Sequence, residues 1–137
     1  MSVSTKPGKG FYVIAVLALL WELMGVVSFL LQDRMATTEA QIALQAQSPA
    51  WINLLYALAV FSGALGALLL VMRRRAAALL FLLSFIAAAL QFGGVFAFTD
   101  ALALLGGSSV VFPVIVVLVG IALWLYARRC ASRGWLR

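Results

Sequence analysis

The chain has 137 residues, of which 66% are hydrophobic and only 10% are charged. Soluble domains are roughly half apolar and about a quarter charged, and a soluble fold of this length has too little interior for so much apolar surface. The composition therefore excludes an ordinary soluble protein and predicts a single integral membrane domain over residues 1–137, whose net charge of +6 indicates topology rather than nucleic-acid binding.

The residues needed for common cofactor and metal sites are missing from the sequence. Histidine is absent and Cys130 is the only cysteine, so an intramolecular disulfide, a Cys/His metal site and a His-ligated haem have no ligands. No glycine-rich phosphate loop, Ser/His/Asp set or paired carboxylates occur. We therefore expect no enzyme activity, no metal and no cofactor.

Four apolar runs are long enough to cross a bilayer, which takes about 20 helical residues. The first run carries Glu22 and lacks a small-residue cleavage pattern, so we expect a retained helix rather than a signal peptide. The second and third runs are separated by a very short turn and should form an antiparallel hairpin. The predicted fold is an all-α, up-and-down antiparallel bundle of four transmembrane helices, over Phe11–Leu31, Trp51–Met72, Ala76–Phe98 and Val110–Ala127.

Basic residues fall almost entirely on one side of these spans. Only Arg34 lies on the other side, together with Asp33, Glu39 and Asp100. By the positive-inside rule, both termini and the turn between the second and third spans are cytoplasmic. The basic residues that indicate topology, or bind lipid headgroups, are Lys6, Lys9, Arg73, Arg74, Arg75, Arg128, Arg129, Arg133 and Arg137.

The first outer loop contains Thr38-Glu39-Ala40-Gln41, which is a capping-box pattern. We expect a short amphipathic helix after Thr38, lying along the membrane surface. Within the spans, spacings of three and four residues gather small and polar side chains on one face of each helix, as expected for helices that associate in lipid. The glycines predicted to allow close helix packing are Gly25, Gly63, Gly66 and Gly120.

Glu22 is the one acidic residue inside a predicted span, and no Lys or Arg lies within any span. An acidic residue at a helix centre costs about 2.5–3.5 kcal/mol on insertion, which the apolar residues around it offset. Three interpretations stay open: a structural hydrogen bond to Ser84 or Gln91, a carboxyl that opens to water and carries a proton or binds a cationic solute, or a residue facing lipid. The candidate solute or proton site is Glu22, Ser62, Ser84 and Gln91.

Several short motifs, spread in order over nearly the whole chain, carry a resemblance to a known family. They are Leu19-Leu20-Trp21 with Met24-Gly25, then Pro49-Ala50-Trp51, the run 63–70 before Arg73-Arg74, Ser84, and Gly134-Trp135-Leu136. In this order the chain resembles a family of small, uncharacterised four-helix bacterial inner-membrane proteins that are often labelled sugar transporters. That family commonly has Asn where this chain has Glu22. The resemblance implies an inner-membrane location and transport of a small solute.

The stretch Glu22-Leu23-Met24-Gly25 also resembles the first helix of small multidrug resistance transporters, which are four-helix chains with an essential Glu in that helix. This resemblance implies proton-coupled transport through Glu22. Dual-topology relatives of those transporters have nearly balanced Lys and Arg, whereas nine of the ten basic residues here lie on one side. Any homo-oligomer is therefore predicted to have parallel subunits.

Two functions follow from these observations. The first is a small-solute transporter with a polar site in the middle of the membrane. The second is an accessory or structural subunit of a larger membrane complex, with Glu22 as a hydrogen-bonded tie between helices. A water-reachable cavity holding Glu22 favours the first function, and a closed core with a hydrogen-bonded carboxyl favours the second.

Overall fold

The computed structural model describes residues 7–35 and 37–136. The long helices are α1 (Lys9–Leu30), α4 (Ala50–Val71), α5 (Ala76–Phe98) and α7 (Val111–Ser132). The short helices are α2 (Gln32–Met35), α3 (Glu39–Gln47), α6 (Ala101–Leu105) and the 3-10 helix η1 (Gly107–Val110), and the described part of the chain contains no strand. The four long helices are long and apolar enough to cross a membrane, and all four leave large apolar side chains exposed. The predicted all-α architecture is confirmed for the described residues, and the length and composition of the four long helices agree with a multi-pass membrane protein.

The predicted boundaries of the spans agree closely with the helices, with one exception. α5 begins and ends as predicted, and α1 and α4 differ from the prediction by one or two residues at each end. α7 continues to Ser132, five residues past the predicted end at Ala127. The residues in between include the good helix formers Arg128, Arg129 and Ala131, and the helix stops only before Gly134, where φ is +76°. Arg128 and Arg129 are therefore part of α7 rather than of a following loop.

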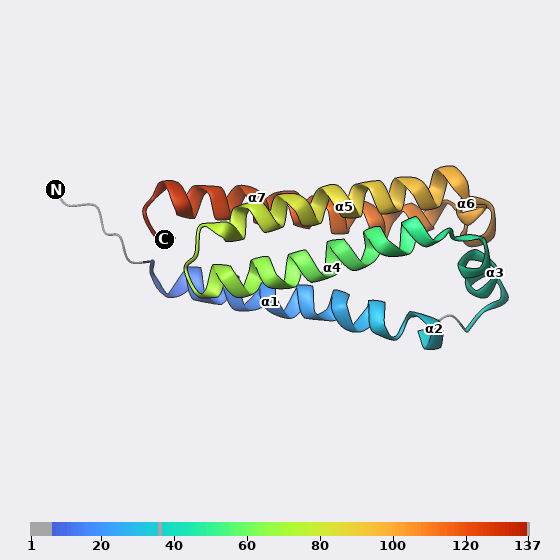
Figure 1. The fold of residues 1–137 in the computed structure, drawn as a ribbon, viewed down its shortest axis with the longest axis horizontal. Coiled ribbons are helices and arrows are strands. Elements are labelled where there is room, and N and C mark those ends of the chain that lie inside the picture. The colour runs from blue at the N-terminus through green and yellow to red at the C-terminus, as the bar shows by residue number, and fades with distance from the viewer. Residues whose placement is uncertain (1–6, 36, 137) are drawn as a thin grey trace.

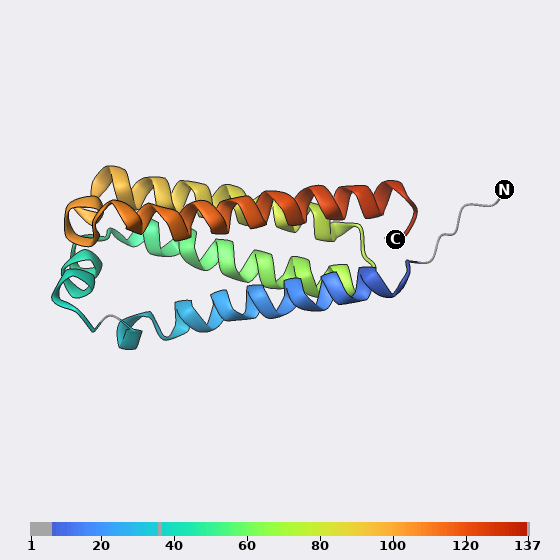
Figure 2. The same ribbon diagram turned by 180° about the vertical axis from the view of Figure 1, so that it is seen from behind.

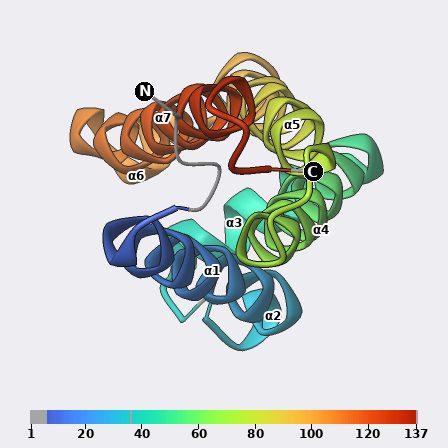
Figure 3. The ribbon, with the colours of Figure 1, turned by 90° about the vertical axis from the view of Figure 1, so that its left-hand side faces the viewer.

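The four long helices form an arc in which each packs beside the next. α1 packs on α4, α4 on α5, and α5 on α7, so α1 and α7 stand at the two ends of the arc (Figure 3). The start of α1, the end of α7 and the α4–α5 turn all lie at one end of the molecule, which we call the terminal end (Figures 1 and 2). α3 and α6 lie at the opposite end, the loop end. Two predicted topology residues, Lys6 and Arg137, lie outside the described residues.

The buried core is concentrated at the terminal end. Toward the loop end, a smaller cluster consists of Ala59, Ala87 and Ala88 at the α4–α5 seam, with Leu55 and Phe92 packed against it. The arc is therefore tightly filled at its terminal end and only thinly filled between its middle and the loop end. The core at the terminal end consists of Phe11, Ala15, Ala18, Ala67, Leu70, Ala77, Phe81, Leu123, Ala127, Cys130 and Leu136.

Polar side chains organise the loop end. The Thr38 hydroxyl accepts a hydrogen bond from the Gln41 backbone N–H at 3.2 Å, and the Gln41 side chain accepts one from the Thr38 N–H at 3.3 Å, so the predicted helix and its capping box are confirmed. Gln47 joins α3 to the start of α6, because its side chain accepts from the Asp100 N–H at 2.9 Å and donates to the Asp100 carboxylate at 3.3 Å. The sequence did not predict α6 and η1, since helices this short carry no clear apolar period.

Candidate functional site

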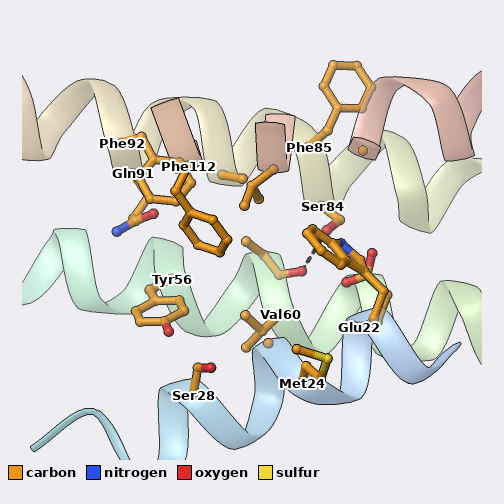
Figure 4. Close-up of a pocket in the computed structure, with 16 residues that line it drawn as sticks. Glu22, Met24, Ser28, Tyr56, Val60, Ser84, Phe85, Gln91, Phe92 and Phe112 are labelled. Carbon is orange, nitrogen blue, oxygen red and sulfur yellow. Dashed lines mark hydrogen bonds between the residues drawn. The ribbon is translucent and has the colours of Figure 1, made fainter. Parts of the chain in front are cut away.

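A cavity of about 260 Å³ lies between the four long helices (Figure 4). A cavity of about 150 Å³ can hold benzene, and sites for drug-sized ligands span roughly 300–1,000 Å³, so the space suits a small solute. Its wall combines small and aliphatic side chains with polar and aromatic ones. The polar and aromatic residues that line it are Trp21, Glu22, Ser28, Tyr56, Ser84, Phe85, Gln91, Phe92 and Phe112.

Glu22 reaches this cavity because of the helical spacing of α1. Its buried residues Phe11, Ala15, Ala18 and Glu22 recur at intervals of four, three and four, which places them on one face. The Glu22 side chain is only 9% exposed. It fits because α4 has a glycine opposite: a Cβ atom at Gly63 would lie 2.7 Å from the Glu22 Cδ atom. The carboxyl group thus rests against the bare backbone of α4.

Ser84 lies beside Glu22 but does not donate a hydrogen bond to it. A Cβ atom at Gly63 would lie 2.8 Å from the Ser84 Oγ atom, which places the hydroxyl and the carboxyl on the same side of α4. The Ser84 hydroxyl instead donates to the Ala59 carbonyl oxygen at 2.6 Å, shown as the dashed line in Figure 4. Among residues 7–35 and 37–136, Glu22 has no hydrogen bond and no ion pair.

The Glu22 carboxyl is open to the cavity rather than sealed in the core. In the described part of the chain, no fully buried side-chain nitrogen or oxygen lacks a hydrogen-bond partner. Because the Glu22 oxygens have no such partner there, they are not fully buried, and the space they border is the cavity that Glu22 lines. The arrangement places Glu22 on a cavity, and it lacks the hydrogen bond to Ser84 or Gln91 required for a structural tie.

Gln91 lies toward the other end of the cavity. It follows Ser84 by seven residues on α5, or about 10 Å along the helix, and Figure 4 shows it away from Glu22 and on the same side as Tyr56 and Ser28. Its side chain is buried, and no hydrogen bond to it occurs within the described residues. Tyr56 and Ser28 were not predicted site residues. The sequence could have indicated Tyr56, because it lies seven residues before Gly63 and residues seven apart lie on the same face of a helix.

Ser62 is buried like the other predicted site residues, but it does not line the cavity. Its hydroxyl donates to the Leu58 and Ala59 carbonyl oxygens of its own helix, the second at 3.4 Å. This bonding pattern is common for serine within helices and satisfies the hydroxyl locally. The structure therefore brings together Glu22, Ser84 and Gln91 on one cavity, and leaves Ser62 outside it.

The predicted packing glycines stand at close contacts between neighbouring helices. A Cβ atom at Gly25 would lie 3.3 Å from Val60 of α4, and one at Gly66 would lie 3.2 Å from the Leu80 Cβ atom of α5. At Gly120 the added atom would lie only 2.6 Å from the Cβ atom of Phe85. Each glycine thus allows two helices of the arc to approach closely.

The cavity is least covered between α1 and α7. Met24 of α1 and Phe112 of α7 both line it, yet their side chains are 64% and 63% exposed. These two helices do not pack extensively on each other. In a bilayer, this side of the cavity would face lipid.

The predicted topology arginines lie at the terminal end, away from the cavity. The Arg128 guanidinium lies 5.0 Å from the centre of the Trp124 ring, a cation–π distance, while Arg74 and Arg129 are exposed. Arg73 and Arg75 instead donate hydrogen bonds to backbone carbonyl groups after α7. No pattern in the sequence predicts these two long-range contacts.

Comparison with protein-family models, with curated proteins and with solved structures found no match. The family resemblance drawn from the sequence motifs therefore stays an expectation. What the chain does has to be argued from the cavity and from the residues that line it.

Proposed function

We propose that the chain is a bacterial inner-membrane protein whose four long helices cross the bilayer in antiparallel order, with both termini in the cytoplasm. The distribution of charge supports this orientation. Lys9, Arg73 and Arg128 belong to the terminal end, whereas Arg34 and Asp100 belong to the loop end. The positive-inside rule places the terminal end in the cytoplasm. α3 then lies along the outer membrane surface, across the end of the bundle (Figure 1).

Within that membrane domain, the proposed function is transport of a small solute, coupled to a proton at Glu22. The observation that carries this proposal is an unpartnered carboxyl that reaches a cavity of about 260 Å³. Glu22 follows Lys9 by 13 residues, or about 20 Å of a helix about 33 Å long, which is near the middle of the membrane. Intramembrane carboxyl groups in such positions commonly mark solute or proton pathways.

The coupling follows from the environment of Glu22. A charged carboxylate in an apolar cavity is costly unless it takes up a proton or gains a cationic partner. Among the lining residues that the structure describes, none carries a positive charge. A proton and a cationic or hydrogen-bonding solute would therefore compete for the same carboxyl. Such competition lets the release of one favour the binding of the other, which is the basis of exchange.

The cavity wall also restricts the class of solute. Ser28, Tyr56 and Gln91 offer neutral hydrogen-bonding groups, and aromatic rings of Trp21 and Phe112 offer faces for stacking. An anionic solute would meet the Glu22 carboxyl with no cation to offset it. The proposed solute is thus a small neutral molecule with hydroxyl groups, such as a sugar, or a small cation.

Flux into proteoliposomes tests this function. Protons, radiolabelled monosaccharides and small quaternary ammonium ions are measured with the wild type, Glu22→Gln and Ser62→Ala. The last variant is the control, because Ser62 is buried at similar depth but lies outside the cavity. We expect flux above empty liposomes that Glu22→Gln abolishes and Ser62→Ala preserves. Equal flux with Glu22→Gln would contradict the role of Glu22, and no flux of any probe would contradict transport of these classes.

A further inference from the structure

The cavity occupies the half of the bundle that is nearer the loop end. On α1 its lining residues fall within 21–28, in the last ten residues of the helix, and on α7 they fall within 112–120, in the first ten. Further toward the terminal end, Ala18 of α1 and Leu123 of α7 are already buried in the core. On that side, the space between the helices is therefore filled by the core.

The side of the cavity between α1 and α7 is exposed on the surface of the bundle. Met24 of α1 and Phe112 of α7 both line the cavity, yet their side chains are more than 60% exposed. α1 and α7 stand at the two ends of the arc and do not pack extensively on each other (Figure 3). Both residues lie in helices that are long and apolar enough to cross a membrane. In a bilayer, this lateral opening between Met24 and Phe112 faces hydrocarbon rather than water.

Polar side chains line the cavity at two levels along its length. Ser28 lies two residues before the end of α1, and Glu22 lies six residues deeper, or about 9 Å along the helix. Figure 4 shows Tyr56 and Gln91 toward the same end as Ser28, and Ser84 beside Glu22. A polar group that moves along the cavity from the loop end therefore meets hydrogen-bonding side chains both at the start and at the level of Glu22.

The kind of these side chains favours a ligand with several hydroxyl groups. Ser28, Tyr56 and Gln91 are neutral, and each can donate and accept hydrogen bonds. Within the described residues, no side-chain hydrogen bond engages any of the three. A cationic group would pair with the carboxyl of Glu22 and leave these three side chains without partners, whereas a hydroxylated group would engage them. The cavity of about 260 Å³ suits one sugar ring, because about 150 Å³ holds benzene.

We propose that the cavity takes up a single-chain amphiphile with a hydroxylated head, such as an alkyl glycoside, from the leaflet at the loop end. The head enters through the lateral opening and binds between Ser28 and Glu22. The chain stays in the hydrocarbon beside Met24 and Phe112, whose side chains are apolar. This inference rests on the proposed function and narrows its solute class, because a free sugar does not dissolve in the hydrocarbon that the opening faces.

Photolabelling in phosphatidylcholine nanodiscs tests the route. The probe is dodecyl glucoside at low mole fraction, with a diazirine on the part of its chain next to the head. We expect saturable labelling of the peptides that contain Met24 and Phe112, mapped by mass spectrometry, which excess dodecyl glucoside displaces and free glucose does not.

Other results of this experiment would overturn the proposal. Displacement by free glucose would show entry from water. Equal displacement by dodecane would show a groove that any apolar chain fills, and stronger displacement by dodecyltrimethylammonium would show a site for a cationic head. Absence of saturable labelling would show that no such amphiphile binds.

A matched pair of variants tests the lateral opening. Met24→Trp narrows the opening, and Leu23→Trp is the control, because Leu23 is exposed on the same helix but does not line the cavity. Neither change removes a core contact. We expect saturable labelling at Phe112 to fall at least about tenfold in Met24→Trp only, which is the effect of a small steric mismatch in a hydrophobic site. Equal labelling in the two variants would contradict entry between Met24 and Phe112.

A second pair tests the site of the head. Gln91→Leu removes one hydrogen-bonding side chain from the cavity, and Ser62→Ala is the control outside it. The concentration of dodecyl glucoside that gives half-maximal labelling should rise roughly threefold to tenfold in Gln91→Leu, as for the loss of one hydrogen bond. No difference between the two variants would overturn the assignment of the head to the cavity. Because labelling requires no transport, flux of a free monosaccharide without labelling would overturn this inference and leave the proposed function standing.

Discussion

The carboxyl of Glu22 occupies the space in which a side chain at Gly63 would begin. A Cβ atom at Gly63 would lie 2.7 Å from the Glu22 Cδ atom and 2.8 Å from the Ser84 Oγ atom, and both distances are shorter than van der Waals contact allows. Glycine at this position is thus a condition for the observed position of Glu22, in addition to its effect on helix packing. Gly63, a predicted packing glycine, and Glu22, a predicted site residue, therefore contact each other directly.

The variant Gly63→Ala should therefore displace the Glu22 carboxyl. We expect Glu22-dependent flux to fall at least tenfold, about the effect of a misplaced group in a preorganised site. Gly93→Ala is the matched control, because it is a second glycine within a long helix and an added Cβ atom there would meet nothing within 4 Å. Flux and thermal unfolding are measured for both variants. Equal flux in the two would show that Glu22 tolerates displacement, against our prediction.

Filling the cavity should remove binding without removing the fold. Ala88 lines the cavity and is buried, whereas its neighbour Ala89 is exposed on the outer side of α5. Ala88→Leu adds volume to the cavity and should abolish solute flux, with a loss of stability below the roughly 1–3 kcal/mol typical of overpacked cores, because space is present. Ala89→Leu should leave flux unchanged. Retained flux in Ala88→Leu would argue against this cavity as the transport site.

Periodicity in the sequence is enough to predict the four long helices and three of the polar residues that line the cavity. Glu22, Ser84 and Gln91 were chosen because spacings of three and four placed them with small residues, and the structure puts all three on one cavity. Ser62 is predicted only as a neighbour of that face at a depth similar to that of Glu22. It is adjacent to Gly63, and adjacent helical residues point in directions about 100° apart. Only Gly63 of that pair faces Glu22.

Other features depend on tertiary contacts that a single sequence does not encode in any periodic pattern. An inward face does not reveal which helices become neighbours, so the weak packing between α1 and α7 could not be predicted. The bonds from Arg73 to Trp135 and from Arg75 to Leu136 join residues more than 60 positions apart. In the sequence, these two arginines cannot be distinguished from basic residues that only determine the topology.

Two buried serines should differ in their contribution to stability. Ser84 donates a hydrogen bond of 2.6 Å from α5 to the Ala59 carbonyl of α4, whereas Ser62 bonds only within α4. Interhelical hydrogen bonds in membranes contribute about 0.6 kcal/mol on average and at most about 1.7 kcal/mol. We expect Ser84→Ala to lower the free energy of unfolding by an amount in this range, and Ser62→Ala to lower it by less. Denaturation in mixed detergent micelles measures both, and the reverse order would contradict the assignment.

The proposed orientation predicts which side of the membrane each loop faces. In a Cys130→Ser background, the thiol introduced by Thr37→Cys lies at the loop end, where Thr37 is exposed, and the thiol introduced by Arg74→Cys lies in the exposed α4–α5 turn. An impermeant maleimide added to intact cells, with their outer membrane permeabilised, should label the first thiol and not the second. Inverted membrane vesicles should give the opposite result. Labelling of both thiols from one side would show mixed orientation, as would be expected if the nine-to-one distribution of basic residues did not control insertion.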